Sequence, residues 1–452
     1  MRKKKHMHFA QFLMHSPTYH SLAMWRHPRT AVNYDWARPE LYQHIAQVCE
    51  RGKFDMVFFA DISFISDTYT GTLDPAIRYA TQAPNHDPTP LLSWIGAVTS
   101  KIGLGGTFSI SHQHPFYVAR LWATLDHLTR GRAAWNVVTS INHNESANYG
   151  EELLAHDLRY ERAEEFMEVC VKLWNSWEAD AVVMDRERGI FADPTKVHRI
   201  EHDGRFFKSR GPLNVTRSPQ NGPAIIQAGA SAKGREFAAR YAEAIFAVQP
   251  FAEGAAEYYA DVKGRMEDLG RNPDHCKILF GIQPIIGRTE QEAREKQEFH
   301  NSLVPVEAGL TILSGHLDYD FSRLALDDVM EYSPDFSIQG LSKMYGKMAG
   351  RKLTLREVAQ LHGQSVSLPQ IVGTPEQVAD QLEAYCEKAG GDGFMLSSIY
   401  TPGAIEEFVD LVIPILQQRG LFRHDYAGTT QRDHLHQEAG SRPEHDAAFR
   451  SA

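Results

Sequence analysis

Short apolar runs recur along the chain and alternate with longer stretches whose apolar residues have helical spacing. Each short run is rich in small, β-branched or aromatic residues and is followed by polar residues or glycine, as a buried strand is. The runs that predict strands are 8–13, 56–60, 102–109, 133–139, 224–228, 244–248, 278–286 and 393–398. Strand followed by helix, eight times over, predicts an α/β fold, a TIM-like (β/α)8 barrel with long insertions.

The intervening stretches predict helices. In one of them Phe166, Val169, Cys170 and Leu173 repeat at the spacing of one helix face. The predicted helices are 41–51, 91–99, 117–128, 160–177, 233–240, 255–269, 290–299, 375–389 and 404–419.

The length of 452 residues fits one elaborated barrel domain over residues 1–425. Three stretches exceed an ordinary connection, at about 61–90, 180–223 and 301–370. Because long insertions in a barrel build lids and pocket walls, we expect these to surround the site. Residues 426–452 are polar and rich in histidine, and we expect a C-terminal arm or a disordered tail there.

Composition excludes several classes of protein. The net charge is -10 and no Lys/Arg block follows the first five residues, so a nucleic-acid surface is not expected. The four cysteines lie more than a hundred residues apart without a CxxC pair, which predicts reduced thiols. Neither a signal peptide nor an 18-residue apolar span is present, so we expect a soluble, cytoplasmic protein that does not enter a membrane.

Polar side chains recur where the predicted strands end, which is the end that carries chemistry in a barrel. These neutral hydrogen-bonding groups with one carboxylate suit a flat, heteroatom-rich ligand better than a polyanion or a metal ion. Caps of strands and turns are the alternative for any one of them. The residues are Asp61, Thr107, Ser109, Asn136, Thr139, Ser140, Gly229, Ala230, Ser231, Gln249, Ser397 and Ser398.

The segment PAIIQAGASAKGREFAARYA, at 223–242, is the sharpest of these junctions. An apolar strand leads through Gly229, Ala230 and Ser231 into a helix, so backbone N–H groups and a hydroxyl converge at a positive helix end, as in a phosphate site. A plain N-cap is the alternative for Ser231. His156 and Tyr160, four residues apart at another helix start, could close a second side of such a site.

Two kinds of motif are missing from the sequence, and each absence argues against one kind of site. No GxGxxG follows a predicted strand, so a built-in nicotinamide-binding unit is absent. The chain has 22 histidines, but no HExxH occurs and the histidine clusters do not give HxH on a first strand together with a carboxylate on a last one, so no metal site is predicted. His15 and His20 follow the first strand and could handle protons.

Five longer motifs carry a family resemblance. They are ERGKFDMVFFAD (50–61), HPFYVARLWATLDHLTRGRAAWNVVTS (114–140), HDLRYERAEEF (156–166), RGPLNVTRSPQNGPAIIQAGASAKGREFAARYAEAIF (210–246) and DGFMLSSIYTPGAIEEFVDLVIPILQQRGLFR (392–423). The chain resembles the bacterial luciferase-like, flavin-dependent monooxygenases, in the group of nitrilotriacetate monooxygenase component A, dibenzothiophene-sulfone monooxygenase and long-chain alkane monooxygenase.

The resemblance implies a barrel that binds reduced FMN non-covalently and uses O2 through a C4a-peroxyflavin. A separate NAD(P)H:flavin reductase would supply the reduced FMN, and the protein would form a homodimer or homotetramer. The implied substrate is a small organic molecule, organosulfur, sulfone or alkane-like. The implied flavin contacts are Asp61, Thr107, Asn136, His156, Tyr160, Gly229, Ala230 and Ser231.

The same resemblance implies roles around the substrate. His20 or His15 would handle the proton and Asn136 would meet the edge of the isoalloxazine. The expected pocket residues are Phe12, Trp25, Phe58, Ile141, Phe251 and His316. Ile141 replaces the histidine that follows the VVTS segment in the alkane enzyme, so that enzyme's proton chemistry does not transfer directly.

Three other functions compete with this one. A deazaflavin-dependent oxidoreductase could use the same barrel, and a flavin-binding protein without catalysis would keep the cofactor contacts. A metal hydrolase on a TIM barrel is the third, and it requires bound zinc or manganese.

Overall fold

The computed structural model describes residues 5–329 and 344–443. All eight predicted strands are present, with ends that differ by at most two residues from the predicted ones. They are β1 (His8–Met14), β2 (Met56–Ala60), β3 (Gly103–Ser109), β4 (Ala133–Val138), β9 (Ala224–Gln227), β10 (Ala244–Ala247), β11 (Lys277–Ile286) and β13 (Gly393–Leu396).

The strands form one parallel sheet that closes on itself. Its order is β10-β9-β4-β3-β2-β1-β13-β11-β12, and β10 also pairs with β11. The short strand β12 (Gln370–Gly373) adds to β11 outside the ring of eight. The predicted fold, a (β/α)8 barrel with insertions, is therefore confirmed.

Helices follow the strands as the apolar spacing predicts. Among the described residues they are α1 (Pro39–Arg51), α2 (Asp74–Arg78), α3 (Thr89–Gly96), α4 (Pro115–Leu128), α5 (His143–Asn148), α6 (His156–Trp174), α7 (Ala232–Tyr241), α8 (Ala252–Asp268), α9 (Glu290–Ser302), α10 (Val306–Leu317), α12 (Leu355–Ser365), α13 (Pro375–Ala389), α14 (Gly403–Glu407), α15 (Ile413–Gln418) and α16 (Gln431–His436). In this part of the chain no helix combines the length and the apolar character needed to cross a lipid bilayer.

The chain divides into two compact units. Unit 1 consists of residues 1–88, 247–260 and 278–424, and unit 2 of residues 89–246, 261–277 and 425–452. The expectation of a single domain over residues 1–425 stays a prediction, because compactness alone does not tell whether either unit folds independently.

Unit 1 has an aromatic core around β1. All seven residues of β1 are buried, and the ring of Phe9 lies within 5.1–6.1 Å, centroid to centroid, of four other phenylalanine rings. A buried ionic cluster lies beside this core, where Asp55 accepts from the guanidinium of Arg423 and lies 2.8 Å from Nδ1 of His8. Since Arg423 follows α15, this contact ties the end of the unit to its first two strands.

Unit 2 has a tryptophan-rich core behind β4. Trp135 stacks on Trp122 of α4 with 5.9 Å between centroids, and its ring meets the edge of Trp174 of α6 at 6.5 Å. The segment after residue 424 returns to this unit through α16. There the fully buried Arg432 pairs with Glu243, so the first part of the expected C-terminal arm is packed, while 444–452 lie outside the described residues.

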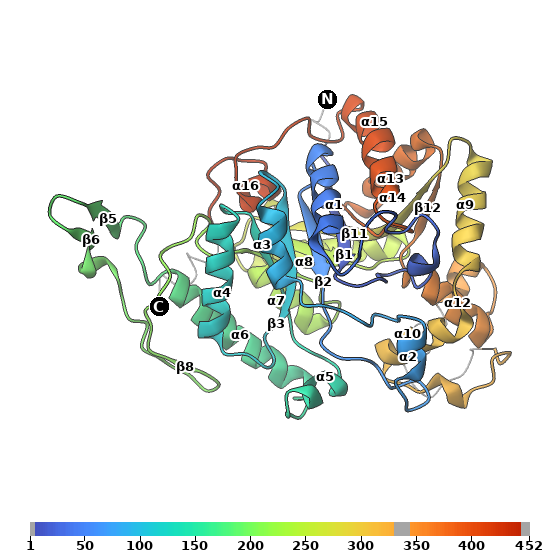
Figure 1. Ribbon diagram of the computed structural model, residues 1–452, viewed down its shortest axis with the longest axis horizontal. Coiled ribbons are helices and arrows are strands. Elements are labelled where there is room, and N and C mark those ends of the chain that lie inside the picture. Colours follow the sequence, from blue (N-terminus) through green and yellow to red (C-terminus); the bar gives the residue numbers. More distant parts are fainter. Residues whose placement is uncertain (1–4, 330–343, 444–452) are drawn as a thin grey trace. The chain divides into compact units, whose positions relative to one another are not determined.

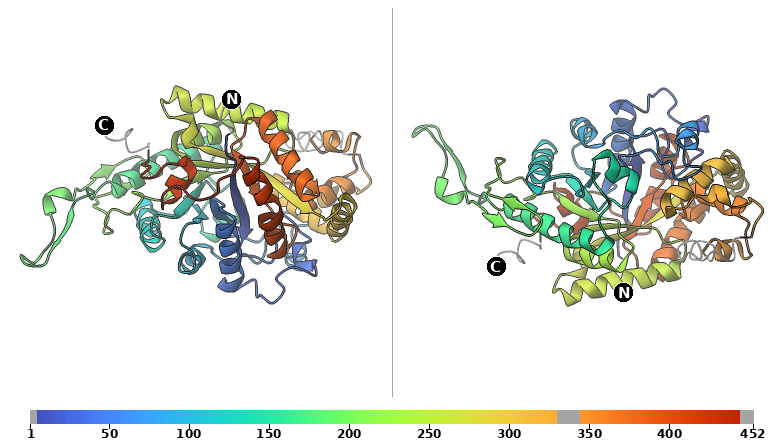
Figure 2. Two further views of the ribbon diagram at one scale, coloured as in Figure 1. Left: turned by 90° about the horizontal axis from the view of Figure 1, so that it is seen from above. Right: turned by 90° about the horizontal axis from the view of Figure 1, so that it is seen from below.

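The 180–223 insertion forms two small hairpins on unit 2. One pairs β5 (Val182–Asp185) with β6 (Ile190–Ala192), and the other pairs β7 (His202–Asp203) with β8 (Lys208–Ser209). The β5–β6 hairpin extends away from α4 and α6 in Figure 1, and both views of Figure 2 show the same extension.

Most predicted helices differ from the structure by up to four residues at their ends, and two of the differences have a clear physical reason. The helix predicted at 160–177 begins at His156 and ends at Trp174, because Trp177 instead forms a β-bridge with Val197. The helix predicted at 404–419 is interrupted by a π-helical turn, Phe408–Val412, just ahead of Pro414. Proline lacks the N–H that an uninterrupted helix needs, and the wider turn accommodates it.

Candidate active site

The adjacent strands β3 and β4 bring together two of the predicted flavin contacts in unit 2. Parallel pairing places Thr107 opposite Asn136, and Nδ2 of Asn136 donates a hydrogen bond to Oγ1 of Thr107 at 2.8 Å. Oδ1 of Asn136 is buried and has no hydrogen-bond partner in the described part of the chain. Since a buried acceptor without a donor is costly, the pair is suited to a ligand that brings an N–H or O–H group.

The first turn of α7 brings together two predicted hydroxyls. Ser231 is the N-cap, and its Oγ accepts a hydrogen bond from N of Gly234 at 3.1 Å. A Cβ on Gly234 would lie 2.9 Å from Oη of Tyr160 and 3.2 Å from Oγ of Ser231. Tyr160 and Ser231 therefore meet at this turn, and only glycine leaves room between them.

The loop from β9 to α7 is closely packed against the same turn. The amide of Gly229 donates to Oε1 of Gln227, and a Cβ on Gly229 would lie 2.9 Å from Cα of Gly234. The carbonyl of Ala230 accepts from Nε of Arg235 at 3.0 Å. Gln227 was not among the predicted site residues, although its position as the last residue of β9 is a signal of the kind used for Thr107 and Asn136.

His156 begins α6 and lies beside Tyr160, with 5.2 Å between ring centroids. The ring is exposed, and its Nδ1 lies 2.8 Å from Oδ1 of Asp157. His156, Tyr160 and Ser231 thus form one group at the meeting point of two helix starts. Helix N-termini carry partial positive charge and unpaired N–H groups, which suits an anion such as a phosphate.

In unit 1, Asp61 directly follows β2 and is paired with a neighbouring amide. Nδ2 of Asn85 donates to Oδ1 of Asp61 at 2.6 Å. Asn85 belongs to the predicted insertion at 61–90, so this insertion holds the carboxylate in place.

Aromatic rings surround His20 in unit 1. His20 stacks on Phe12 of β1 with 4.0 Å between centroids, and Phe12 lies 5.9 Å from Phe58 of β2. Burial lowers the pKa of His20 to about 3. The imidazole is therefore neutral at neutral pH, and the rings of Phe12 and Phe58 give it apolar, uncharged surroundings.

His316 lies near the end of α10, with its Nδ1 3.1 Å from Nε2 of His362 on α12. The residue is exposed, but desolvation by the surrounding protein lowers the pKa of His316 to about 4, and His316 in turn contributes to the lowered pKa of His20. His362 was not predicted. It lies 46 residues from its partner, and no local pattern marks a contact of that kind.

His15 and Trp25 lie in surroundings of their own. Nε2 of His15 lies 3.2 Å from the carbonyl of Ala37, its ring packs edge-on against Tyr42, and burial lowers its pKa. Trp25 is half exposed and donates from Nε1 to the carbonyl of Tyr79 at 3.2 Å. The roles predicted for these two residues stay predictions.

Phe251 and Ile141 complete the predicted set. Phe251 of unit 1 precedes α8, and the ammonium of Lys347 lies 4.2 Å from the centroid of its ring. Ile141 of unit 2 follows β4 and is 71% exposed, which is unusual for an isoleucine next to a buried strand.

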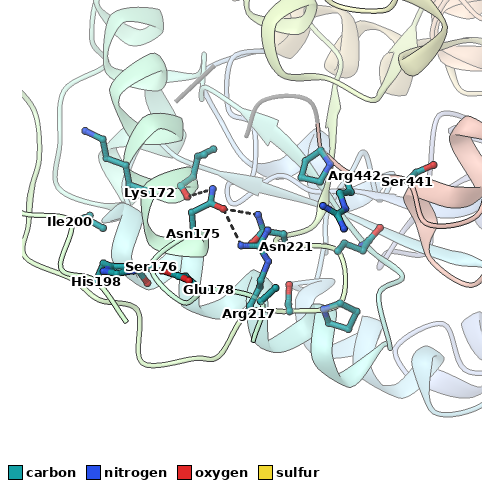
Figure 3. A pocket seen from close by; sticks show the side chains of 16 residues that line it. Lys172, Asn175, Ser176, Glu178, His198, Ile200, Arg217, Asn221, Ser441 and Arg442 are labelled. Atoms are coloured by element: carbon teal, nitrogen blue, oxygen red, sulfur yellow. Dashed lines mark hydrogen bonds and ion pairs between the residues drawn. The ribbon is translucent and has the colours of Figure 1, made fainter. Parts of the chain in front are cut away.

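A separate cavity of about 840 Å³ lies in unit 2 and contains none of the predicted site residues. Figure 3 shows it between the second half of α6 and the 180–223 insertion. There Oδ1 of Asn175 accepts from Arg217 at 3.2 Å and from Asn221 at 3.0 Å. Within residues 5–329 and 344–443, no three His, Cys, Asp or Glu side chains gather so as to hold a metal ion.

Comparisons with known proteins show which family the chain belongs to. The family model "Luciferase-like monooxygenase" matches residues 18–393. The chain is similar to the dibenzothiophene-sulfone monooxygenase of Rhodococcus erythropolis (strain XP), with 42% identity over 96% of this chain and 97% of the relative. It is 40% identical to nitrilotriacetate monooxygenase component A of Aminobacter aminovorans, over 91% of this chain and 92% of the relative.

Among solved structures, the chain is similar to a riboflavin lyase crystallised with modified FMN and the substrate riboflavin. The TM-score is 0.89 and the identity 32%, over 98% of this chain and 99% of the lyase. The matches to named monooxygenases cover nearly the whole chain. The chain therefore belongs to the luciferase-like monooxygenase family.

Proposed function

We propose that this monooxygenase binds reduced FMN and uses O2 to oxygenate a small, uncharged organic substrate. The observation that carries the proposal is the arrangement at the start of α7, where the hydroxyls of Tyr160 and Ser231 and the backbone of Gly229 meet around Gly234. A phosphate fits such a group of neutral donors at a helix N-terminus.

The described residues of unit 2 fit the other parts of FMN as well. Ser231, Tyr160 and the amides of the first turn of α7 would hold the phosphate, with His156 beside them. Asn136, with its buried Oδ1, would accept from an N–H of the ring system or a hydroxyl of the ribityl chain. Asp61 of unit 1 is assigned to the flavin from the family resemblance alone.

Reduced flavin, when bound, supplies the two electrons with which O2 is split between the substrate and water. The protein has to bind the cofactor, orient it and keep water out. In this chain, neutral hydrogen-bonding side chains do the binding, while the aromatic rings around His20 supply an apolar surface. We assign proton handling to His20 or His15.

The substrate class follows from the charges in unit 1. Phe12 and Phe58 are apolar, and burial keeps His20 and His316 neutral, with pKa values of about 3 and about 4. A polycarboxylate would need cationic partners. A sulfone, sulfide or alkane needs none, so we propose an organosulfur or alkane-like substrate. The relatives named for sulfone and alkane oxidation support the same class.

A separate reductase is the proposed partner. The chain lacks the glycine-rich dinucleotide motif that a nicotinamide site would need, and one relative is named as component A of its system. We therefore expect an NAD(P)H:flavin reductase to supply the reduced FMN. A homodimer or homotetramer is proposed from the resemblance.

Two measurements test the function. Titrations with FMN, riboflavin and a deazaflavin, followed by fluorescence, should give the tightest binding for FMN, because only FMN among the first two carries the phosphate. Turnover is then assayed with FMN, NADH, a flavin reductase and ¹⁸O2 on aromatic sulfones, sulfonates, sulfides, alkanes and aminopolycarboxylates. Incorporation of one ¹⁸O atom into a neutral substrate is the expected result.

Other outcomes would point to the competing functions. Tighter binding of the deazaflavin would favour an oxidoreductase on the same barrel. FMN binding without turnover of any substrate would favour a flavin-binding protein, and stoichiometric zinc or manganese in elemental analysis would favour a hydrolase.

A further inference from the structure

A line of hydrogen-bonding side chains ends at His316 in unit 1. Oγ of Ser367 lies 2.8 Å from Oη of Tyr345, and this Oη lies 2.8 Å from Nδ1 of His362. Nε2 of His362 lies 3.1 Å from Nδ1 of His316. The residues come from three places in the chain, since α10 carries His316, α12 carries His362, and Tyr345 lies in the helical residues 344–349.

The inner members of this line are closed off from solvent. Tyr345 is fully buried, His362 is 4% exposed and Ser367 is 7% exposed. Burial raises the pKa of Tyr345 and lowers the pKa of His362 well below its usual value. Since burial also lowers the pKa of His316, the phenol and both imidazoles are neutral at neutral pH.

Because Tyr345, His362 and His316 are neutral, each hydrogen bond along this line has one direction. A neutral imidazole has one N–H and one bare nitrogen, so His362 donates to one neighbour and accepts from the other. Between an imidazole nitrogen and a serine hydroxyl, the imidazole nitrogen is the stronger acceptor, and Tyr345 donates to it. His362 then carries its proton on Nε2 and donates to Nδ1 of His316. Ser367 is left to donate to the phenol oxygen.

We propose that Ser367, Tyr345 and His362 act as positioning residues that hold His316 in its Nε2–H tautomer. Which ring nitrogen of a histidine carries the proton is set by the partner of the other nitrogen. Because Nδ1 of His316 accepts from His362, its proton stays on Nε2, which has no partner in the described part of the chain. His316 therefore presents a fixed, uncharged hydrogen-bond donor.

The Nε2–H tautomer of His316 affects which substrates the enzyme prefers. This part of the inference rests on the proposed function. A fixed N–H donor pairs with an oxygen acceptor on the substrate, such as a sulfone or sulfoxide oxygen. A plain alkane has no acceptor and forgoes the hydrogen bond that an acceptor-bearing substrate makes with this donor. Among the substrates proposed above, His316 therefore favours those that carry an oxygen acceptor.

The first test needs no turnover. Protein labelled with ¹⁵N-histidine is studied at pH 7.5 by long-range ¹H–¹⁵N correlation, which separates the Nε2–H and Nδ1–H tautomers by their nitrogen shifts. The signals of His316 are identified by their loss in His316→Gln. We expect Nε2–H in the wild-type protein. In Tyr345→Phe the donor to Nδ1 of His362 is gone, and we expect the tautomer ratio of His316 to fall at least fivefold.

The second test compares donors and non-donors at position 362. A glutamine amide still donates to Nδ1 of His316, whereas leucine does not. For an acceptor-bearing substrate we expect His362→Leu to lower kcat at least tenfold with KM within threefold, and His362→Gln to stay within threefold of wild type. The control is Tyr385→Phe, which removes another partly buried phenol, one that donates to the carbonyl of Gln249 at 3.1 Å.

The wild-type spectrum decides the proposal even if a variant fails to fold. An Nδ1–H signal for His316, or a tautomer ratio unchanged in both Tyr345→Phe and His362→Leu, would overturn it. If the spectrum shows Nε2–H for His316 but no substrate is turned over, the positioning role stands. The proposed function is then the part that is contradicted.

Discussion

The two units differ in how they position uncharged hydrogen-bonding groups. In unit 2 the predicted flavin contacts are neutral groups at strand ends and helix starts, and short local spacing brings them together, as at Ser231 and Gly234. In unit 1, burial lowers the pKa of His20, His316 and His362 and keeps them neutral. Their contacts join distant elements, as between His316 and His362. One region depends on backbone geometry and the other on exclusion of water.

This difference predicts that the two regions respond to different changes. In unit 2, the arrangement of Tyr160, Ser231 and Gly229 around Gly234 should be sensitive to added atoms and insensitive to pH. The histidine cluster in unit 1 should tolerate small changes of volume better than a change of protonation. The changes below test that contrast, in order of decreasing effect.

The largest effect is expected from Gly229→Val in unit 2. A Cβ at this position would lie 2.8 Å from the Gln227 amide and 2.9 Å from Cα of Gly234, and valine adds two further methyl groups. Such overpacking costs about 3 kcal/mol, and the loop can relieve it only by leaving the turn. We expect FMN to bind at least a hundredfold more weakly in a fluorescence titration.

Gly264→Ala is the matched control for that change. A Cβ on Gly264, in the middle of α8, meets no atom within 4 Å, and alanine is the better helix former. FMN affinity should stay within twofold of wild type. Equal losses of affinity in the two variants would contradict a specific role of the Gly229 backbone in binding FMN.

The pattern of the sequence predicted the barrel strands of both units and the polar pairs of unit 2 better than the histidine contacts of unit 1, for a physical reason. All eight barrel strands follow from short-range patterning, and so do Thr107 opposite Asn136 and Ser231 at a helix start. Each of these depends on residues within a few positions of one another or on the parallel register of adjacent strands. Backbone periodicity carries that information.

The cluster in unit 1 depends on tertiary packing that no local pattern records. His362 meets His316 only because α10 packs on α12, and Tyr345 reaches His362 from a third helical segment. Among 22 histidines, spacing alone does not single out these two. The strand β12 was missed because its four residues, QIVG, hold only two apolar side chains, whereas the equally short β9 and β10 are nearly continuous apolar runs.

The next effect is a loss of stability at mildly acid pH, caused by unit 1. His300 and His362 are buried, and burial lowers the pKa of His300 to about 4 and that of His362 well below its usual value. The unfolded chain takes up these protons below about pH 6.5 and the folded chain does not. The stability they contribute is therefore complete above pH 6.5 and is lost as the pH falls toward 4.

Urea unfolding at pH 7.5, 6.5 and 5.5 measures this loss. Each such histidine contributes about 1 kcal/mol between pH 6.5 and 5.5, because the slope approaches about 1.4 kcal/mol per pH unit only below the pKa of the unfolded chain. His300 and His362 together should therefore account for about 2 kcal/mol of the loss, and His300→Gln should reduce the loss by about 1 kcal/mol. A free energy of unfolding that is constant over this range would show that the cluster is protonated or open to water.

A smaller effect, confined to the cofactor, is expected from Ser231→Ala. One charge-assisted hydrogen bond to phosphate contributes about 2 kcal/mol, so FMN should bind about thirtyfold more weakly while riboflavin affinity stays unchanged. The change also removes an N-cap, which costs about 1 kcal/mol of stability. Thr289→Ala removes the N-cap of α9 in the same way and controls for this loss. Equal FMN affinity in the two variants would place the phosphate elsewhere.

The smallest effect on stability is expected from Ile141→Ala, which changes a predicted pocket residue shortly after the barrel strand β4. Ile141 is 71% exposed, so its truncation should change the free energy of unfolding by less than about 0.5 kcal/mol. Val137→Ala, four residues earlier on β4 and fully buried, should cost about 2 kcal/mol. If Ile141 faces the substrate, its variant should alter the ratio of kcat/KM between sulfone and alkane substrates while FMN affinity stays within twofold. An unchanged ratio would assign Ile141 to the surface, and substrate choice would then rest with residues of unit 1 such as His316.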